Sequence, residues 1–180
     1  MIKRIYIWLS ALVCLVACRP VNPSSYRGMP KEYKTAYQQI YGHCYDSLPD
    51  LAVVSLDLYS EGLELNKDKR IIGTGYNLFL SDIFVPDSLL EEGEYASFPS
   101  DSLPKSFTFL RGRDYEGTPH GMYILNIEND KVIHIQVLDS GRFVYSNDSL
   151  LFTLYYRNVY GGKVTYSCSY TGPLIPWLKR

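Results

Sequence analysis

The feature that most constrains this sequence is an alternation of apolar and polar side chains in short, closely spaced runs. The clearest run is near the C-terminus, where Tyr166, Cys168 and Tyr170 alternate with polar residues between Lys163 and Thr171. Successive side chains of a strand point to opposite faces, so this spacing predicts strands with one buried face and one solvated face. Such runs cover residues 54–59, 76–81, 94–98, 106–111, 121–128, 131–138, 142–146, 151–158 and 163–171.

The connections between these runs are short. Residues 128–131 and 158–162 have the composition of tight turns. Strands joined so closely are antiparallel neighbours, because a parallel crossover needs a dozen or more residues. The sequence therefore predicts an all-β fold, an antiparallel meander of about nine strands. The meander forms either a calycin-like β-barrel or a two-sheet sandwich, and the periodicity does not choose between them.

A short helix is expected ahead of the sheet. Between Lys31 and Tyr45 the aromatic residues recur three to four positions apart, and the first glycine is Gly42.

The length and net charge of the chain limit the classes of function to consider. The chain has 180 residues, about the length of one domain. Its formal net charge of -1 provides no excess of basic residues to neutralise a phosphate backbone, so no nucleic-acid partner is expected. The 17 tyrosines fit a half-buried β-surface.

The N-terminus has the pattern of an export signal. An apolar run over residues 5–16 follows Lys3 and Arg4, and it is too short to span a bilayer. The run leads into Leu15-Val16-Ala17-Cys18, which resembles a bacterial lipobox. That resemblance implies removal of residues 1–17 and lipidation of Cys18, which would anchor the protein to a membrane. The alternative is an ordinary signal peptide with a chance cysteine.

The sequence after the signal divides into a tether and a domain. Residues 18–30 are rich in proline, serine and glycine, which predicts a flexible tether. Residues 31–180 are expected to form a single antiparallel β domain. No acidic run resembling a Bacteroidetes surface-export signal follows Cys18. The expected location is therefore the cell envelope, lipid-anchored to the outer membrane and facing the periplasm.

Three motifs within the domain carry a family resemblance: Gly73-Thr74-Gly75-Tyr76, Gly93-Glu94-Tyr95 and Tyr170-Thr171-Gly172-Pro173-Leu174. They resemble a family of uncharacterised Bacteroidetes envelope lipoproteins with all-β domains, over roughly residues 51–174. The resemblance implies a fold and a location, but no activity and no functional residue.

Two cysteines remain in the domain. Cys44 and Cys168 are a candidate disulfide if the compartment is oxidising. The alternative is two separate thiols, because Cys168 lies on the apolar face of its predicted strand. The chain has no Cys-x-x-Cys motif, and only His43 lies near either cysteine, so neither a metal site nor a cofactor is expected.

The sequence does not predict an enzyme. His134 and Gln136 alternate with isoleucines, which favours a solvent-facing position over a ligand-lined interior. His120 lies in a segment with the composition of a turn. There is no Gly-x-Ser-x-Gly elbow, and no acid, base and nucleophile cluster along the chain.

The tripeptide Asp-Ser-Leu occurs four times, always between predicted strands. Asp-Ser is common in turns, and that preference alone could explain the repetition. The tripeptide also resembles the periplasmic O-glycosylation acceptor of Bacteroidetes. The candidate acceptors are Ser47, Ser88, Ser102 and Ser149.

Together these patterns indicate a membrane-anchored envelope lipoprotein that acts as a non-catalytic binding or structural module, with an unidentified envelope protein or glycan as partner. The alternative is a small-molecule or glycan carrier with a tyrosine-lined barrel interior. A solid apolar core would favour the module, whereas water-accessible aromatic side chains inside the barrel would favour the carrier.

Overall fold

The computed structural model describes residues 28–99 and 101–178, and the regular structure in these residues is entirely β-strand. In chain order the strands are β1 (Glu32–Tyr33), β2 (Thr35–Gly42), β3 (Ala52–Tyr59), β4 (Leu63–Leu65), β5 (Ile71–Gly73), β6 (Gly75–Val85), β7 (Gly93–Phe98), β8 (Thr108–Leu110), β9 (Arg113–Tyr115), β10 (Thr118–His120), β11 (Met122–Glu128), β12 (Lys131–Val137), β13 (Ser140–Ser146), β14 (Ser149–Arg157), β15 (Lys163–Thr171) and β16 (Ile175–Leu178).

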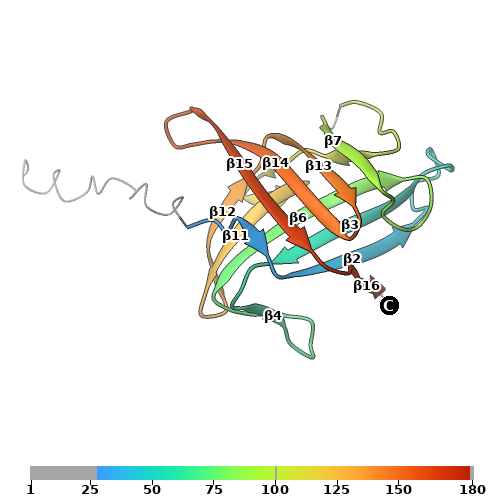
Figure 1. Ribbon diagram of the computed structural model, residues 1–180. Coiled ribbons are helices and arrows are strands. Elements are labelled where there is room, and N and C mark those ends of the chain that lie inside the picture. Colours follow the sequence, from blue (N-terminus) through green and yellow to red (C-terminus); the bar gives the residue numbers. More distant parts are fainter. Residues whose placement is uncertain (1–27, 100, 179–180) are drawn as a thin grey trace, which may run out of the picture.

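Twelve of these strands form one curled, barrel-like sheet (Figure 1). Its order is β1-β15-β14-β13-β7-β8-β6-β3-β2-β16, and the β11–β12 hairpin branches from β6. Two small hairpins, β4–β5 and β9–β10, complete the described structure. The predicted all-β class is therefore confirmed.

The strand count differs from the expected one. Each of the nine predicted runs contains a strand, but the described residues form sixteen strands in all. The additional strands are mostly segments of two to four residues, too short for an alternating pattern to be recognised.

The predicted N-terminal helix is wrong, because residues 32–42 form β1 and β2 instead. Tyrosines four residues apart fit one face of a helix, but they also fit one face of a strand. Ala36 and Gln38 point to the buried side, while Tyr37 lies on the other face. Tertiary pairing with β3 and β15 decides between the two patterns.

The first two strands of the chain pair with the last two and join the two ends of the sheet. β1 pairs with β15 in parallel, and after Lys34 the same segment continues as β2, which pairs with β16 in parallel and with β3 in antiparallel fashion. β7 and β8 form a third parallel pair. The predicted purely antiparallel meander is thus corrected to a mixed sheet, because pairs distant in sequence cannot be read from loop lengths.

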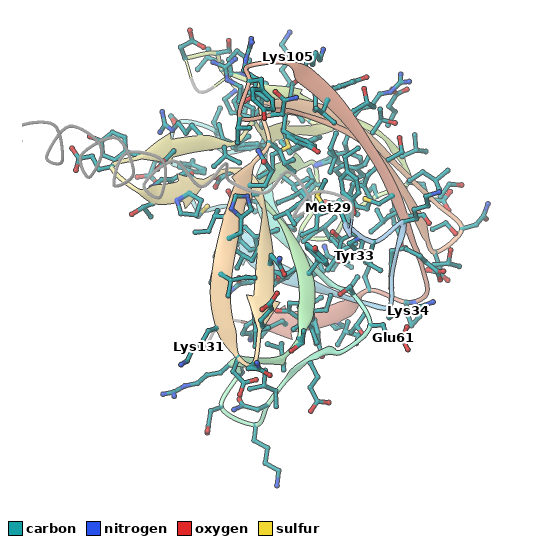
Figure 2. The ribbon with its side chains drawn as sticks, turned by 90° about the vertical axis from the view of Figure 1, so that its left-hand side faces the viewer. Met29, Tyr33, Lys34, Glu61, Lys105 and Lys131 are labelled. Carbon is teal, nitrogen blue, oxygen red and sulfur yellow. The ribbon has the colours of Figure 1, made fainter. Side chains whose placement is uncertain are left out.

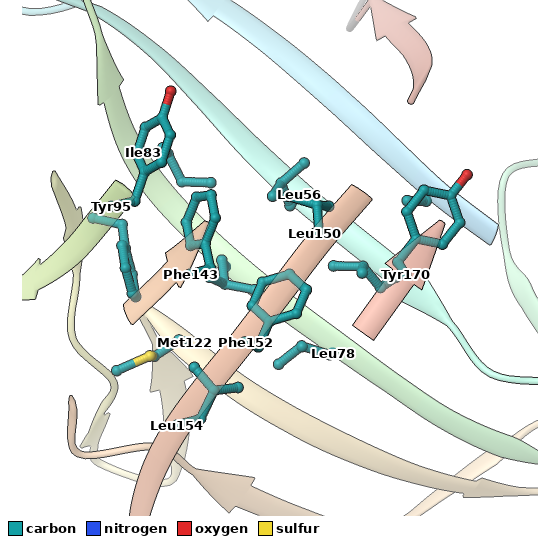
Figure 3. Packing of buried hydrophobic residues seen from close by; sticks show 14 of the residues in the cluster. Leu56, Leu78, Ile83, Tyr95, Met122, Phe143, Leu150, Phe152, Leu154 and Tyr170 are labelled. Atoms are coloured by element: carbon teal, nitrogen blue, oxygen red, sulfur yellow. The ribbon is translucent and has the colours of Figure 1, made fainter. Parts of the chain in front are cut away.

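The inner face of the sheet is filled with apolar side chains (Figure 3). Tyr95, Phe109 and Phe143 are each fully buried. The rings of Tyr95 and Phe143 stack with their centroids 4.4 Å apart, and Phe152 packs on Phe143 at 5.4 Å. This packing makes the interior a solid hydrophobic core.

A second, smaller cluster lies on the outer face. The β4–β5 hairpin places Leu63 over Tyr59 and Ile127, with Leu125 and Tyr37 at its edge. The hairpin therefore covers part of the outer face of β3 and β11, a contact that the alternating pattern does not predict.

Candidate functional site

Aromatic and apolar side chains cross the outer face of the sheet in one row. Directly paired residues of neighbouring strands share a face, so the register of strand pairing defines the row. It runs through Val137 of β12, Tyr123 of β11, Phe79 of β6, Asp57 of β3, Tyr37 of β2 and Ile175 of β16. We call these six residues the outer row.

A β-bulge creates the β12 end of the outer row. From the turn, Ile127 pairs with Val132, and after an irregularity between Asn126 and Ile127 the pairing continues with Asn126 opposite His134 and Leu125 opposite Ile135. A shift of one residue moves every following side chain to the opposite face. Ile135, opposite Leu125, consequently lies on the outer face, and Ile133, the unpaired residue at the bulge, is also exposed rather than in the core.

The same bulge corrects the expectation for two polar residues of β12. His134 pairs with Asn126, and Gln136 pairs with Ile124, which is buried on the core side. Both polar residues are half-buried on the core-facing side of the hairpin, not on the solvated face as predicted. His120 also differs from expectation, because it lies in strand β10 rather than in a turn.

Asp57 lies at the centre of the outer row, and its carboxylate accepts two side-chain hydrogen bonds. The Tyr59 hydroxyl donates to one carboxylate oxygen at 2.7 Å, and the Asn77 amide donates to the other. The same Asn77 amide also donates to the Leu58 carbonyl at 3.1 Å. Burial raises the pKa of the Asp57 carboxyl, and the two donors only partly offset this effect.

Aromatic rings surround this carboxyl group. Phe79 and Tyr123 lie with their centroids 5.1 Å apart. The centroid of the Tyr37 ring lies 5.6 Å from that of Tyr59 and 6.3 Å from that of Trp177. Burial, together with the nearby Asp57 charge, raises the pKa of Tyr123 to about 12, so its hydroxyl stays a neutral donor and acceptor. The outer row thus combines ring faces with polar groups at its centre.

A groove lined by arginines lies at the base of the β9–β10 hairpin. Its volume is about 530 Å³, and its lining consists of Arg111, Gly112, Arg113, Asp114, Val137, Asp139 and Arg157. Arg157 pairs with Asp139 at 3.7 Å. Gly112 allows the close backbone approach beneath the groove, because a Cβ there would meet the carbonyl oxygens of Met122 and Leu138.

A smaller aromatic hollow of about 240 Å³ adjoins this groove through Arg113. Phe84 lies between Tyr45 and Phe98, at ring distances of 6.0 and 5.7 Å. The Tyr45 hydroxyl donates to Asp82 at 3.4 Å. Both hollows open at the surface, and neither reaches the packed interior.

The Gly73-Thr74-Gly75 motif has a structural role. Gly73 has φ 107°, and a Cβ there would meet the Gly62 carbonyl. The Gly73 amide donates to the Asp130 carboxylate, and the Thr74 hydroxyl accepts from the Asn129 amide at 3.0 Å. The motif therefore fastens the corner between β5 and β6 to the β11–β12 turn.

The structure separates the two domain cysteines. Cys168 is buried on the inner face of β15 beside Tyr33, whereas Cys44 is exposed beyond the far end of β2, and both are free thiols. The eight residues of β2 alone span roughly 25 Å, far more than the distance that a disulfide can bridge. The candidate Cys44–Cys168 bond is accordingly not formed, and the alternative of two separate thiols describes this structure.

The predicted modification sites differ in accessibility. Ser47, Ser88 and Ser102 are exposed in connections between strands. Ser149 is half-buried at the start of β14, with its hydroxyl 3.4 Å from that of Thr171. Cys18 lies outside the described residues, as does most of the predicted tether. Met29, at the end of that predicted tether, packs against the core.

Residues 28–99 and 101–178 contain no group of three or more His, Cys, Asp or Glu side chains placed to hold a metal ion. In the same part of the chain, no helix has the length and apolar character needed to cross a membrane.

The chain matches no protein-family model, no curated protein and no solved structure. The resemblance to Bacteroidetes envelope lipoproteins therefore stays a prediction from the sequence motifs.

Proposed function

We propose that this protein is a lipid-anchored, non-catalytic module of the cell envelope that binds its partner on the outer surface of the sheet. The observation that carries the proposal is the contrast between the two faces. The inner face is packed solid, with fully buried side chains such as Tyr95 and Phe143, whereas aromatic rings cross the partly accessible outer face. A carrier would need an interior cavity of a few hundred cubic ångströms. The packing therefore favours surface binding over the carrier alternative.

The curled sheet supports a calycin-like barrel rather than a two-sheet sandwich. Its main strands follow one continuous path of hydrogen-bonded neighbours. The segment formed by β1 and β2 connects the two ends of that path, through parallel pairing with β15 and β16. Binding in this barrel would use the outer wall and the rim, because the core occupies the inside.

The lipid anchor rests on Leu15-Val16-Ala17 before Cys18. Metabolic labelling with a fatty-acid analogue tests it in wild type and in Cys18→Ala. We expect label only in the wild type and release of the variant from the membrane fraction. Cys14→Ala is the matched control, since it removes a cysteine from the signal without removing the acceptor. Equal labelling of wild type and Cys18→Ala would contradict the anchor.

Among partners, the outer row favours a glycan. Ring faces such as those of Phe79 and Tyr123 pack against the apolar C–H faces of sugars, and the half-buried Asp57 carboxyl suits a sugar hydroxyl. Few polar groups among many aromatic side chains are typical of a small-molecule binding site.

Calorimetric titration with chitooligosaccharides and with soluble peptidoglycan fragments tests this preference. Phe79→Ala and Tyr123→Ala should each weaken binding about tenfold, equivalent to 1.4 kcal/mol. Tyr155→Ala is the control, because this half-buried ring lies on β14, away from the outer row. There the Lys163 ammonium group lies 4.1 Å from the centroid of the Tyr155 ring. If neither saccharide binds the wild type, the glycan is excluded and a protein partner is favoured.

A further inference from the structure

The directions of the strands place each connection at one of the two ends of the barrel. At one end lie the β2–β3, β6–β7 and β13–β14 connections together with the β7–β8 loop, and we call this end the distal rim. At the other end lie the first described residues, the β3–β4 connection and the turns of the β11–β12 and β14–β15 hairpins, and we call it the proximal rim. Figure 1 shows the start of the described chain on the same side as these two turns. Figure 2 looks onto this side, with Met29 near the middle and Lys131 on the β11–β12 hairpin.

The two rims differ in charge. The distal connections with their flanking residues contain one basic residue, Lys105, and seven acidic ones: Asp46, Asp50, Asp87, Glu91, Glu92, Asp101 and Asp148. The corresponding proximal segments are balanced, with Lys31, Lys131, Arg157 and Lys163 against Glu32, Glu61, Glu128 and Asp130. An anionic surface would therefore repel the distal rim and tolerate the proximal rim.

The proximal rim also presents apolar side chains at its two hairpins. Tyr160 is 80% exposed and Val159 56% exposed in the β14–β15 turn. Val132 and Ile133 are each 51% exposed next to the β11–β12 turn. Lys131 and Lys163 flank these turns. Tyrosine and apolar side chains beside basic residues are typical of protein surfaces that contact lipid headgroups.

We infer that the proximal rim rests on the surface of the bilayer, with the β11–β12 and β14–β15 turns in contact with lipid headgroups and the acidic rim pointing away. The inference rests on the proposed anchor at Cys18. Nine residues lie between Cys18 and Gly28, so the ten residue-to-residue steps reach only about 35 Å even in a fully extended chain. The anchor therefore keeps the proximal rim close to the membrane, and charge and apolar contact determine which side turns toward it.

Fluorescence quenching by brominated lipids tests the orientation. In the mature chain Trp177 is the one native tryptophan if residues 1–17 are removed. In a Trp177→Phe background, Tyr160→Trp reports on the proximal rim. Leu103→Trp reports on the distal rim at a position that is 83% exposed. The acylated protein is reconstituted in vesicles of phosphatidylethanolamine and phosphatidylglycerol with brominated acyl chains.

We expect several-fold stronger quenching of Tyr160→Trp than of Leu103→Trp. In vesicle-bound protein, equal quenching at both positions, stronger quenching at Leu103→Trp or no quenching at either would overturn the inference. Adding Lys131→Glu and Lys163→Glu should weaken the quenching at position 160, whereas Lys105→Glu on the distal rim should not. Unchanged quenching in the double variant would show that these two lysines do not contribute to the orientation on the membrane.

A second preparation separates this inference from the anchor. In a Cys44→Ser background, the Cys18 thiol of the mature chain is coupled to a maleimide-bearing lipid in the same vesicles. If the native protein fails to associate with vesicles, the proposed anchor is wrong. The coupled protein still tests the rim, and equal quenching there would show that the orientation is wrong whatever the native attachment.

Discussion

At the residue scale, Asp57 links the outer row to the stability of the sheet. Burial raises its folded-state pKa above the unfolded value of about 3.9. Between these two values the folded state binds more protons than the unfolded state, so stability falls as the pH rises. Each unit of elevation costs about 1.4 kcal/mol once the group is ionised in both states.

Asp57→Asn should abolish this decline. Urea denaturation of wild type and variant between pH 3.5 and 8 measures it, because the asparagine side chain does not titrate. As the pH rises, the unfolding free energy of Asp57→Asn should increase relative to that of the wild type. Asp148→Asn, at an exposed turn position, is the control. A difference for Asp57→Asn that stays constant over the whole range would show that the group is not perturbed.

The two domain cysteines make a second prediction at this scale. Burial raises the pKa of the Cys168 thiol to about 12, so almost no reactive thiolate forms at neutral pH. Ellman's reagent should therefore label Cys44 rapidly in the native protein and Cys168 only after unfolding. Cys44→Ser should remove the fast phase alone. Absence of both thiols from the unreduced, unfolded protein would show a disulfide after all.

At the scale of elements, the seam between β1 and β15 depends on buried tyrosines. The Tyr166 hydroxyl donates to the Pro30 carbonyl and lies 3.2 Å from the Tyr33 hydroxyl. Tyr166→Phe leaves both partners without this contact, and we expect it to cost about 1–3 kcal/mol of unfolding free energy. Chemical denaturation measures the loss. Tyr155→Phe, on the outer side of β14, should change the stability little, and an equal loss in both variants would contradict a special role for the seam.

How much of the fold is predictable depends on the element. In β15 the alternation from Lys163 to Thr171 is uninterrupted, and its predicted buried face is the observed one. In β12 an equally regular alternation gives the wrong face, because the bulge next to Asn126 shifts the register. A sequence pattern shows which residues share a face, but the partner strand determines which face is buried.

The candidate site could not be predicted from the sequence for the same reason. Its members lie on six strands, from Val137 to Ile175, and only the pairing brings them into one row. Phe79 and Tyr123 each look like ordinary strand residues when the chain is read alone. Asp57 stands among apolar neighbours in the sequence, and this was the one local signal that could have marked the site.

At the scale of the whole molecule, the four Asp-Ser-Leu copies gather at the distal rim. Three of the serines are exposed, at Ser47, Ser88 and Ser102, while Ser149 is half-buried. In the proposed orientation this rim points away from the bilayer. A modifying enzyme would therefore reach the three exposed serines without obstruction by the membrane.

We expect glycan at one or more of the exposed serines and less or none at Ser149, whose hydroxyl lies 3.4 Å from Thr171 Oγ1. Intact-mass measurement of protein from its native host, corrected for the lipid, detects the added mass. Ser47→Ala, Ser88→Ala and Ser102→Ala combined should remove most of it, whereas Ser149→Ala, the matched control, should remove little. A polypeptide mass with no addition would reject glycosylation, and modification confined to Ser149 would show that exposure at the rim does not select the acceptor.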